Sequence, residues 1–203
     1  NYGSFEIIGS SPEMIVKEND GKIQTCPIAG TRRRGRNKEE DESLRKELEN
    51  DPKERAEHLM LVDLARNDMG RVSEFGTVRV PQFMNVQNYS HVIHLVSLVE
   101  GRKKEEYHPC DLLNSFLPAG TLSGAPKIRA MEIIDELEET KRGLYGGAIG
   151  YMDFSGNMDF CITIRTMIKK GKKVYLQAGA GIVADSVPES EYEECRNKVK
   201  ALA

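Results

Sequence analysis

The sequence predicts a mixed α/β protein of the α+β type, with a largely antiparallel sheet and flanking helices. Apolar runs of strand length recur along the chain and are joined by tight turns, such as those at residues 19–21 and 155–157. Two-residue turns join antiparallel neighbours, whereas parallel strands need long crossovers. Helical periodicity is confined to a few segments between groups of strands, which favours helices packed beside the sheet.

The composition is that of an ordinary globular protein. Of 203 residues, 39% are hydrophobic and 30% are charged, which argues against disorder and against a coiled coil. The net charge of -3 argues against a general nucleic-acid binder. Its longest apolar run, 92–99, is too short to cross a bilayer, and no signal segment opens the chain. We therefore expect a cytoplasmic protein without a membrane or nucleic-acid partner.

In the first half of the chain, strands are expected over three segments, 5–8, 14–16 and 22–28. The highly charged stretch 31–50 predicts a mobile exposed loop and a solvated helix. Residues 51–54 then form a D-x-x-E capping pattern with proline at the first helical position. An apolar stripe follows at helical spacing, so a helix is expected over 52–66.

In the second half, strands and helices are expected in alternating groups. The expected strands are 77–80, 91–99, 144–153, 158–167 and 173–178. The expected helices are 111–116, a long one from Pro126 to about residue 139, and a last one over 188–202. A loop of small residues, 118–124, precedes the long helix.

Two of these helices carry acidic pairs that could hold a metal ion. Glu54 and Glu57 are three residues apart on the first, and Glu191 and Glu194 repeat that spacing on the last, with Lys198 one turn further on. Four converging carboxylates would repel one another, and a hard divalent cation relieves that repulsion. Magnesium suits oxygen ligands better than zinc does, since no Cys/His cluster accompanies them. The alternative is that both pairs lie on ordinary solvated faces.

Two glycine-rich segments resemble phosphate-binding motifs without satisfying them. Residues 120–127 lack the Walker spacing. Residues 179–184 match G-x-G-x-x-A, but too little chain follows for the helix, second strand and acidic residue of a dinucleotide fold. What remains is a turn whose backbone amides could approach an anionic ligand.

Three further side chains could take part in chemistry, each with a structural alternative. His94, in an apolar strand, is either a hydrogen-bonded core residue or a catalytic group. Arg165 ends an apolar strand and needs an anion, supplied by a protein carboxylate or by a carboxylate substrate. Glu13 follows a turn and is either exposed surface or an acid of the site.

In combination, these segments resemble the chorismate-utilising enzymes, and most closely their anthranilate-forming branch. The resemblance covers essentially the whole chain. It is carried by nine ordered motifs: GSSPE at 9–13, PIAGTR at 27–32, ERAEHLMLVDLARND at 54–68, HLVS at 94–97, PAGTLSGAPK at 118–127, YGGAIGY at 145–151, TIR at 163–165, AGAGIVA at 178–184 and the C-terminal helix. It implies that family's two-sheet fold and conversion of chorismate and ammonia to anthranilate and pyruvate.

By the same resemblance, Mg²⁺ is held by Glu57 and Glu194, with Glu54 and Glu191 completing the acidic surround. Glu13 matches the general acid, and His94 matches the histidine associated with the second step, elimination of pyruvate. The residues implied to bind chorismate are Gly30, Thr121, Tyr145, Arg165, Gly179, Gly181 and Lys198. The implied partner is a glutamine amidotransferase subunit that supplies ammonia.

Several alternatives stay open within this family. Ala29 occupies the position where aminodeoxychorismate synthases carry a nucleophilic lysine, which disfavours that branch. The basic lysine of isochorismate and salicylate synthases would lie on a strand before Asn1, so it cannot be checked. We expect residues 1–203 to be the C-terminal major part of a chorismate-binding catalytic domain, lacking the first strands and the N-terminal regulatory region. Alone, they are expected to be insensitive to tryptophan and weakly active, or an inactive chorismate-binding fragment.

Overall fold

A computed structural model describes residues 1–200 and 202, and the chain forms two compact units. The first unit comprises Asn1–Pro12, Leu117–Gly150 and the chain from Phe160 onward; the second comprises Glu13–Phe116 and Tyr151–Asp159. The strand pairings between β1 and β9, β9 and β10, β2 and β3, and β6 and its three partners are all antiparallel. The predicted fold class, mixed α/β with antiparallel sheets and flanking helices, is confirmed.

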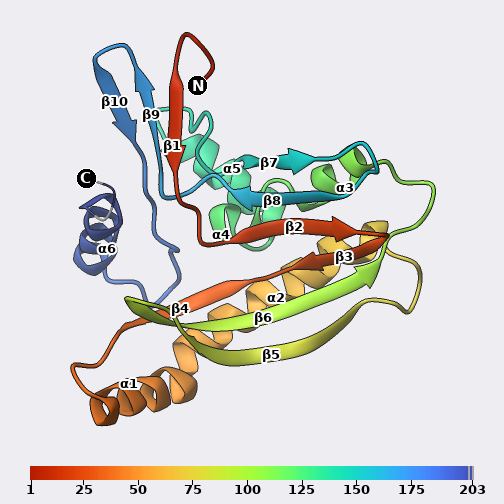
Figure 1. Ribbon diagram of the computed structural model, residues 1–203. Helices are drawn as coiled ribbons and strands as arrows, with labels where there is room; N and C mark the ends of the chain where they lie inside the picture. The colour runs from red at the N-terminus through yellow and green to blue at the C-terminus, as the bar shows by residue number, and fades with distance from the viewer. Residues whose placement is uncertain (201, 203) are drawn as a thin grey trace. The chain divides into compact units, whose positions relative to one another are not determined.

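The second unit is built around one long strand. The strands concerned are β2 (Met14–Asn19), β3 (Lys22–Thr25), β4 (Ile28–Arg33), β5 (Arg79–Asn88) and β6 (Val92–Arg102). β3 and β4 pair with successive parts of β6, and β5 also pairs with β6 (Figure 1). The single strand predicted over 22–28 is in fact two, divided at Cys26 and Pro27, because proline has no N–H for a sheet ladder.

Helix α2 (Pro52–Val72) lies along one face of this sheet, and Figure 1 shows it following β4 and β6. Asp51 caps its first turn by accepting hydrogen bonds from the backbone N–H groups of Lys53 (3.0 Å) and Glu54 (3.2 Å). The helix continues six residues beyond the predicted end. Met69 and Val72 are 0% and 2% exposed, so burial of apolar side chains extends it.

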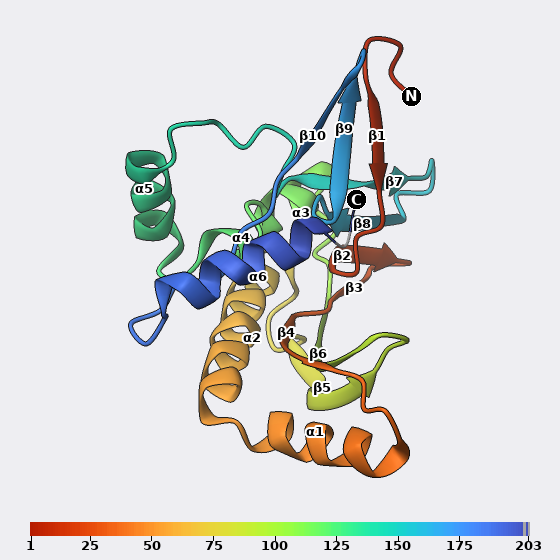
Figure 2. The ribbon, with the colours of Figure 1, turned by 90° about the vertical axis from the view of Figure 1, so that its left-hand side faces the viewer.

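Helix α1 (Lys38–Asn50) corrects the prediction of a mobile segment. Leu48 is fully buried and packs with Ile93 and Leu95 of β6. Arg34 binds the carboxylate of Asp41, which fastens the turn before the helix. Figure 2 shows α1 running across the end of α2. The charged run therefore makes specific ion pairs, while one leucine anchors the helix to the sheet. The remaining helix of this unit, α3, spans Pro109–Phe116.

The first unit contains a three-stranded sheet in the order β1 (Glu6–Gly9), β9 (Thr166–Lys170), β10 (Lys173–Leu176), side by side in Figure 2. Its helices are α4 (Gly120–Ser123), α5 (Lys127–Leu137) and α6 (Pro188–Lys200). The strand predicted over 158–167 divides into β8 (Met158–Ile162) and β9, because Arg165 takes a left-handed φ of 49° between them.

Strand β7 (Ala148–Met152) is shorter than the predicted 144–153. β8 and β7 follow β2 in the strand order of the larger sheet, and the division between the units passes through both strands. Within residues 1–200 and 202, none of the helices is long and apolar enough to cross a membrane.

Candidate functional site

A strand irregularity places Gly30 against the helix layer of the second unit. Gly30 has a φ of +64°, and the pairing of β4 with β6 shifts register between Ala29 and Thr31. A Cβ atom on Gly30 would lie 2.8 Å from Cδ1 of Leu48 and 3.1 Å from Oε2 of Glu54. Glycine is therefore required for both conformation and space, and the structure brings Gly30 and Glu54 together.

His94 is joined to the same segment. Its Nδ1 lies 2.8 Å from the carbonyl oxygen of Gly30 and 3.2 Å from Oγ1 of Thr31. Because a carbonyl oxygen only accepts, Nδ1 carries the proton and Nε2 is the nitrogen that can accept one. The ring of Tyr89 stands edge-on to the imidazole, with 5.4 Å between centroids. His94 is half-buried rather than part of the apolar core.

Arg32 is a residue of this region that the sequence analysis missed. Its side chain is 19% exposed and uses all three guanidinium nitrogens. The acceptors are Oε1 of Glu47 at 2.8 Å, Oδ2 of Asp51 at 2.7 Å, Oε1 of Glu54 at 3.1 Å and the Thr31 carbonyl oxygen at 3.1 Å. Burial disfavours the charged form, but the hydrogen bonds to Glu47 and Glu54 outweigh it and raise the pKa of Arg32.

This contact changes the description of the acidic pair on α2. Glu54 and Glu57 are both half-buried, but Glu54 is ion-paired with Arg32. The sequence places Arg32 directly after Gly30 and Thr31, which is the one local indication that Arg32 belongs to the site. The charged run 31–50 that contains Arg32 favours a solvated face, because an ion pair between a strand and a helix leaves no periodic pattern in the sequence.

Glu13 is only 9% exposed, so the alternative that it lies on exposed surface is wrong. Burial is the main cause that raises the pKa of the Cys26 thiol, and the nearby negative charge of the Glu13 carboxylate raises it further. Burial first, and Cys26 second, raise the pKa of Tyr89, whose ring packs on His94. Glu13, Cys26, Tyr89 and His94 therefore belong to one region of the second unit.

In the first unit, the predicted ligand-binding residues Tyr145 and Lys198 both lie against Gly179. A Cβ on Gly179 would lie 3.1 Å from the hydroxyl oxygen of Tyr145. Nζ of Lys198 donates to the Gly179 carbonyl oxygen at 2.9 Å and lies 2.5 Å from Oε1 of Glu194. Burial raises the pKa of Tyr145, and the nearby charges of Arg142 and Arg165 oppose that shift.

The other predicted residues of the first unit have these positions. Arg165 is half-buried, and its backbone carbonyl accepts from the Ser10 N–H at 3.1 Å. Thr121 and Glu191 are half-buried, on α4 and α6. Gly181 and Glu194 are exposed.

Each unit carries an acidic pair whose oxygen atoms are of the kind that binds a hard metal ion. In the part of the chain that is described, no three His, Cys, Asp or Glu side chains gather closely enough to hold one. The acidic pair of the second unit is Glu54 and Glu57, and that of the first is Glu191 and Glu194. Glu54 is ion-paired with Arg32, and Glu194 is ion-paired with Lys198. Carboxylates of this kind match the hard-oxygen preference of Mg²⁺.

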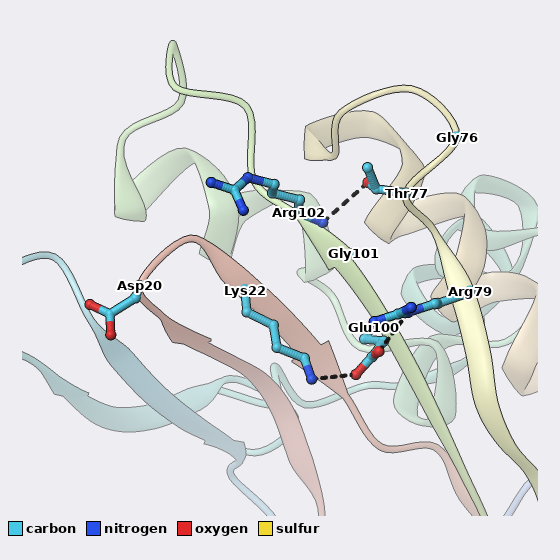
Figure 3. A pocket seen from close by; sticks show the side chains of 8 residues that line it. All are labelled: Asp20, Lys22, Gly76, Thr77, Arg79, Glu100, Gly101 and Arg102. Carbon is cyan, nitrogen blue, oxygen red and sulfur yellow. Dashed lines mark hydrogen bonds and ion pairs between the residues drawn. The ribbon is translucent and has the colours of Figure 1, made fainter.

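A pocket of about 370 Å³ lies elsewhere on the second unit, and Figure 3 shows its lining. It is lined by Asp20, Lys22, Gly76, Thr77, Arg79, Glu100, Gly101 and Arg102. Glu100 is 5% exposed and lies 2.7 Å from both Nζ of Lys22 and Nε of Arg79. None of the predicted site residues lines this pocket.

The comparisons identify the class of protein to which this arrangement belongs. Residues 1–203 match the family of chorismate binding enzymes, and the chain belongs to that family. It is a homologue of anthranilate synthase component 1. It is 67% identical to that protein of Acetivibrio thermocellus over 99% of this chain and 41% of the relative. The protein of Aquifex aeolicus (strain VF5) is 57% identical over 100% of this chain and 41% of the relative.

Solved structures agree in fold. Anthranilate synthase component I from Streptococcus pneumoniae TIGR4 superimposes with a TM-score of 0.92 at 51% identity, over 99% of this chain and 44% of that one. The menaquinone-specific isochorismate synthase of Escherichia coli gives 0.88 at 28% identity, over 98% and 46%. The family expected from the nine motifs is confirmed. The chain spans about two-fifths of the length of the curated relatives named above.

Proposed function

We propose that this chain is part of an enzyme that converts chorismate and ammonia into anthranilate, pyruvate and water. The observation that carries the proposal is the 57–67% identity, over nearly all of the chain, to proteins named anthranilate synthase component 1. The word component implies a second one. We propose that it is a glutamine amidotransferase subunit that supplies the ammonia.

The first step adds ammonia at C2 of the ring while the C4 hydroxyl leaves. Hydroxide is a poor leaving group, so a general acid must protonate it. We assign this role to Glu13. Its 9% exposure supports the assignment, because a general acid acts in a site from which bulk water is largely excluded.

The second step eliminates pyruvate and makes the ring aromatic. The carbon that received the nitrogen must lose a proton, and we assign His94 to this step. Support comes from its hydrogen bond to Gly30, which places the proton on Nδ1 and directs the basic lone pair to Nε2.

Chorismate binding is assigned to seven residues that the family motifs mark for it. Tyr145 and Arg165 would hold the enolpyruvyl carboxylate, and a guanidinium suits a carboxylate because it can donate two parallel hydrogen bonds. Thr121 would shape the pocket beside the ring. Backbone groups of Gly30, Gly179 and Gly181 and the ammonium group of Lys198 would complete the binding site. The convergence of Tyr145, Gly179 and Lys198 supports this grouping.

We further propose that Glu57 and Glu194 hold Mg²⁺, with Glu54 and Glu191 nearby. When bound, the ion would anchor the ring carboxylate of chorismate and offset the charge that develops during the addition. The carboxylate donor set and the half-buried position of Glu57 support the assignment.

Three alternatives remain within the same fold. An aminodeoxychorismate synthase is disfavoured by Ala29, which cannot act as a nucleophile. An isochorismate synthase is disfavoured by the lower identity, 28%, to the enzyme of that activity. A chorismate-binding protein without turnover is the third possibility.

The test uses the complete gene product that contains this chain, supplied with chorismate, Mg²⁺ and ammonium ion. We expect a product with the mass and fluorescence of anthranilate, formed together with pyruvate. Isochorismate or an aminodeoxychorismate as the end product would overturn the proposal. Chorismate binding measured by calorimetry, with no product of any kind, would instead establish the silent binding protein.

Metal assignment is tested in the same assay. Glu57→Gln and Glu194→Gln should each lower activity strongly and raise the Mg²⁺ concentration needed for half of the remaining rate. Matched controls on the same helices are Asp63→Asn and Glu193→Gln, whose carboxylates pair with Arg66 and Arg196 on exposed surface. Equal loss in the controls would show general damage to the helices, and unchanged Mg²⁺ dependence in both glutamine variants would refute the assignment.

A further inference from the structure

The partly exposed guanidinium group of Arg32 donates hydrogen bonds from all three of its nitrogen atoms. It bonds to carboxylates of Glu47 before the end of α1, Asp51 between the two helices, and Glu54 in the first turn of α2. It also bonds to the carbonyl oxygen of Thr31 on its own strand. The guanidinium thereby ties the strand that carries Gly30 to the start of the helix that carries Glu57.

We propose that Arg32 is a positioning residue that neutralises Glu54 and so keeps the acidic pair of α2 from binding a divalent cation tightly before chorismate arrives. This inference rests on the proposed function and deepens it, because it assigns the order in which ligands are held. Arg32 itself touches neither ligand in this account and acts through Glu54 and the Thr31 carbonyl.

The spacing of Glu54 and Glu57 along α2 explains why Arg32 affects a cation bound at Glu57. Side chains three residues apart on a helix are neighbours, with roughly 5–6 Å between Cβ atoms. A cation placed at Glu57 therefore feels the charge of Glu54 strongly, and feels it less when a guanidinium lies 3.1 Å from that carboxylate. Removing the guanidinium alone would raise the net negative charge beside Glu57 by one unit.

Arg32 also affects the backbone at Gly30, where chorismate is proposed to bind. Oε2 of Glu54 is the atom that a Cβ on Gly30 would meet at 3.1 Å, and the Thr31 carbonyl accepts from Arg32. Loss of Arg32 would leave a charged carboxylate next to the Gly30 backbone without its counter-ion. An anionic substrate would be repelled there, and the strand would lose one of its attachments to α2.

These two effects have opposite signs, which makes the proposal testable. In the complete gene product, Mn²⁺ affinity without chorismate is measured by electron paramagnetic resonance, and the KM for chorismate is measured separately. Arg32→Gln should lower the Kd for Mn²⁺ about five- to tenfold, as expected for a freed neighbouring charge. It should raise the KM for chorismate by a similar factor. A structural role alone would weaken both.

A double variant tests whether Arg32 acts on Mn²⁺ binding through the charge of Glu54. In Arg32→Gln with Glu54→Gln, the freed charge is gone, so the Kd for Mn²⁺ should return to within about twofold of the wild-type value. The matched control is Arg34→Gln, which removes an equally well-bonded arginine two residues along whose carboxylate partner is Asp41. Arg34→Gln should leave the Kd for Mn²⁺ unchanged.

Unaltered or weaker Mn²⁺ binding in Arg32→Gln would overturn the inference, as would failure of the double variant to restore it. Should Arg32→Gln not fold, Arg32→Lys gives the test, because lysine retains the charge but reaches fewer acceptors. Its Kd for Mn²⁺ must then stay at the wild-type value while the KM rises. Glu57→Gln distinguishes failure of this inference from failure of the proposed function. If Glu57→Gln leaves Mn²⁺ binding intact, the assignment of Glu57 as a metal ligand has failed instead.

Discussion

The Nδ1 atom of His94 lies 2.8 Å from the carbonyl oxygen of Gly30. This bond links a histidine of β6 to the irregular strand β4, whose glycine contacts the start of α2. It fixes which ring nitrogen carries the proton, and it places the histidine, the glycine and Glu54 in one connected region of the second unit.

Replacing His94 with glutamine should slow the second step more than the first. We expect the aminated, non-aromatic intermediate to accumulate, because loss of the Nε2 base affects proton removal and not ammonia addition. Liquid chromatography with mass spectrometry measures the intermediate and anthranilate together. His91→Gln, an exposed histidine on the same segment, is the control. If neither step changes in His94→Gln, the residue is a hydrogen-bonded structural histidine.

Gly30→Ala should be costly in stability and in binding. Its Cβ would approach Leu48 to 2.8 Å at a φ of +64°, so we expect a loss of about 2–4 kcal/mol in the free energy of unfolding and a higher KM. Gly21→Ala provides the comparison, because Gly21 has a φ of +80° and nothing within 4 Å. It should cost only about 1 kcal/mol. Equal losses in urea denaturation would contradict the close approach described for Gly30.

Local sequence signals predicted much of the fold and only part of the site. The cap at Asp51 and the apolar stripe located α2, and turn residues located most strands. Breaks caused by Pro27 and Arg165 were missed, since an apolar run continues across both. Arg32 was missed because its partners are 15 to 22 residues away, and such pairing depends on tertiary packing. The burial of Glu13 likewise depends on neighbours that no local pattern reveals.

Gly179→Ala tests the contact with Tyr145 in the first unit. A methyl group 3.1 Å from the tyrosine hydroxyl oxygen should displace that ring and raise the KM for chorismate several-fold, with a smaller effect on kcat. Adding Tyr145→Phe removes the atom that the methyl group meets. In the double variant, the extra effect of Gly179→Ala should therefore shrink. Purely additive effects of the two substitutions would show that the residues do not interact.

Glu100 should contribute stability that is lost in acid. The hydrogen bond from Lys22 is the main cause that lowers the pKa of Glu100. Burial opposes this shift, and the hydrogen bond from Arg79 adds to it. A lowered carboxylate pKa stabilises the fold above the unfolded-state pKa, about 4.3, and this contribution fades as pH falls through the folded-state pKa below that value.

We therefore expect Glu100→Gln to lower the free energy of unfolding by about 1–2 kcal/mol at pH 7, and by less as the pH falls below about 4. Denaturant titrations across that range measure the difference. Glu74→Gln, on a more exposed pair with Arg102, should cost under about 0.5 kcal/mol at either pH. A Glu100→Gln penalty that did not vary with pH would contradict the ion-pair explanation.

We propose that Glu57 and Glu194 together hold the divalent ion to which chorismate is anchored. Crystals of the complete gene product grown with Mn²⁺ and chorismate, measured at the manganese absorption edge, test it directly. We predict one anomalous peak within coordination distance, about 2.0–2.3 Å, of carboxylate oxygens from both glutamates and of the substrate's ring carboxylate. A peak bound to neither glutamate, with chorismate held elsewhere, would contradict the account.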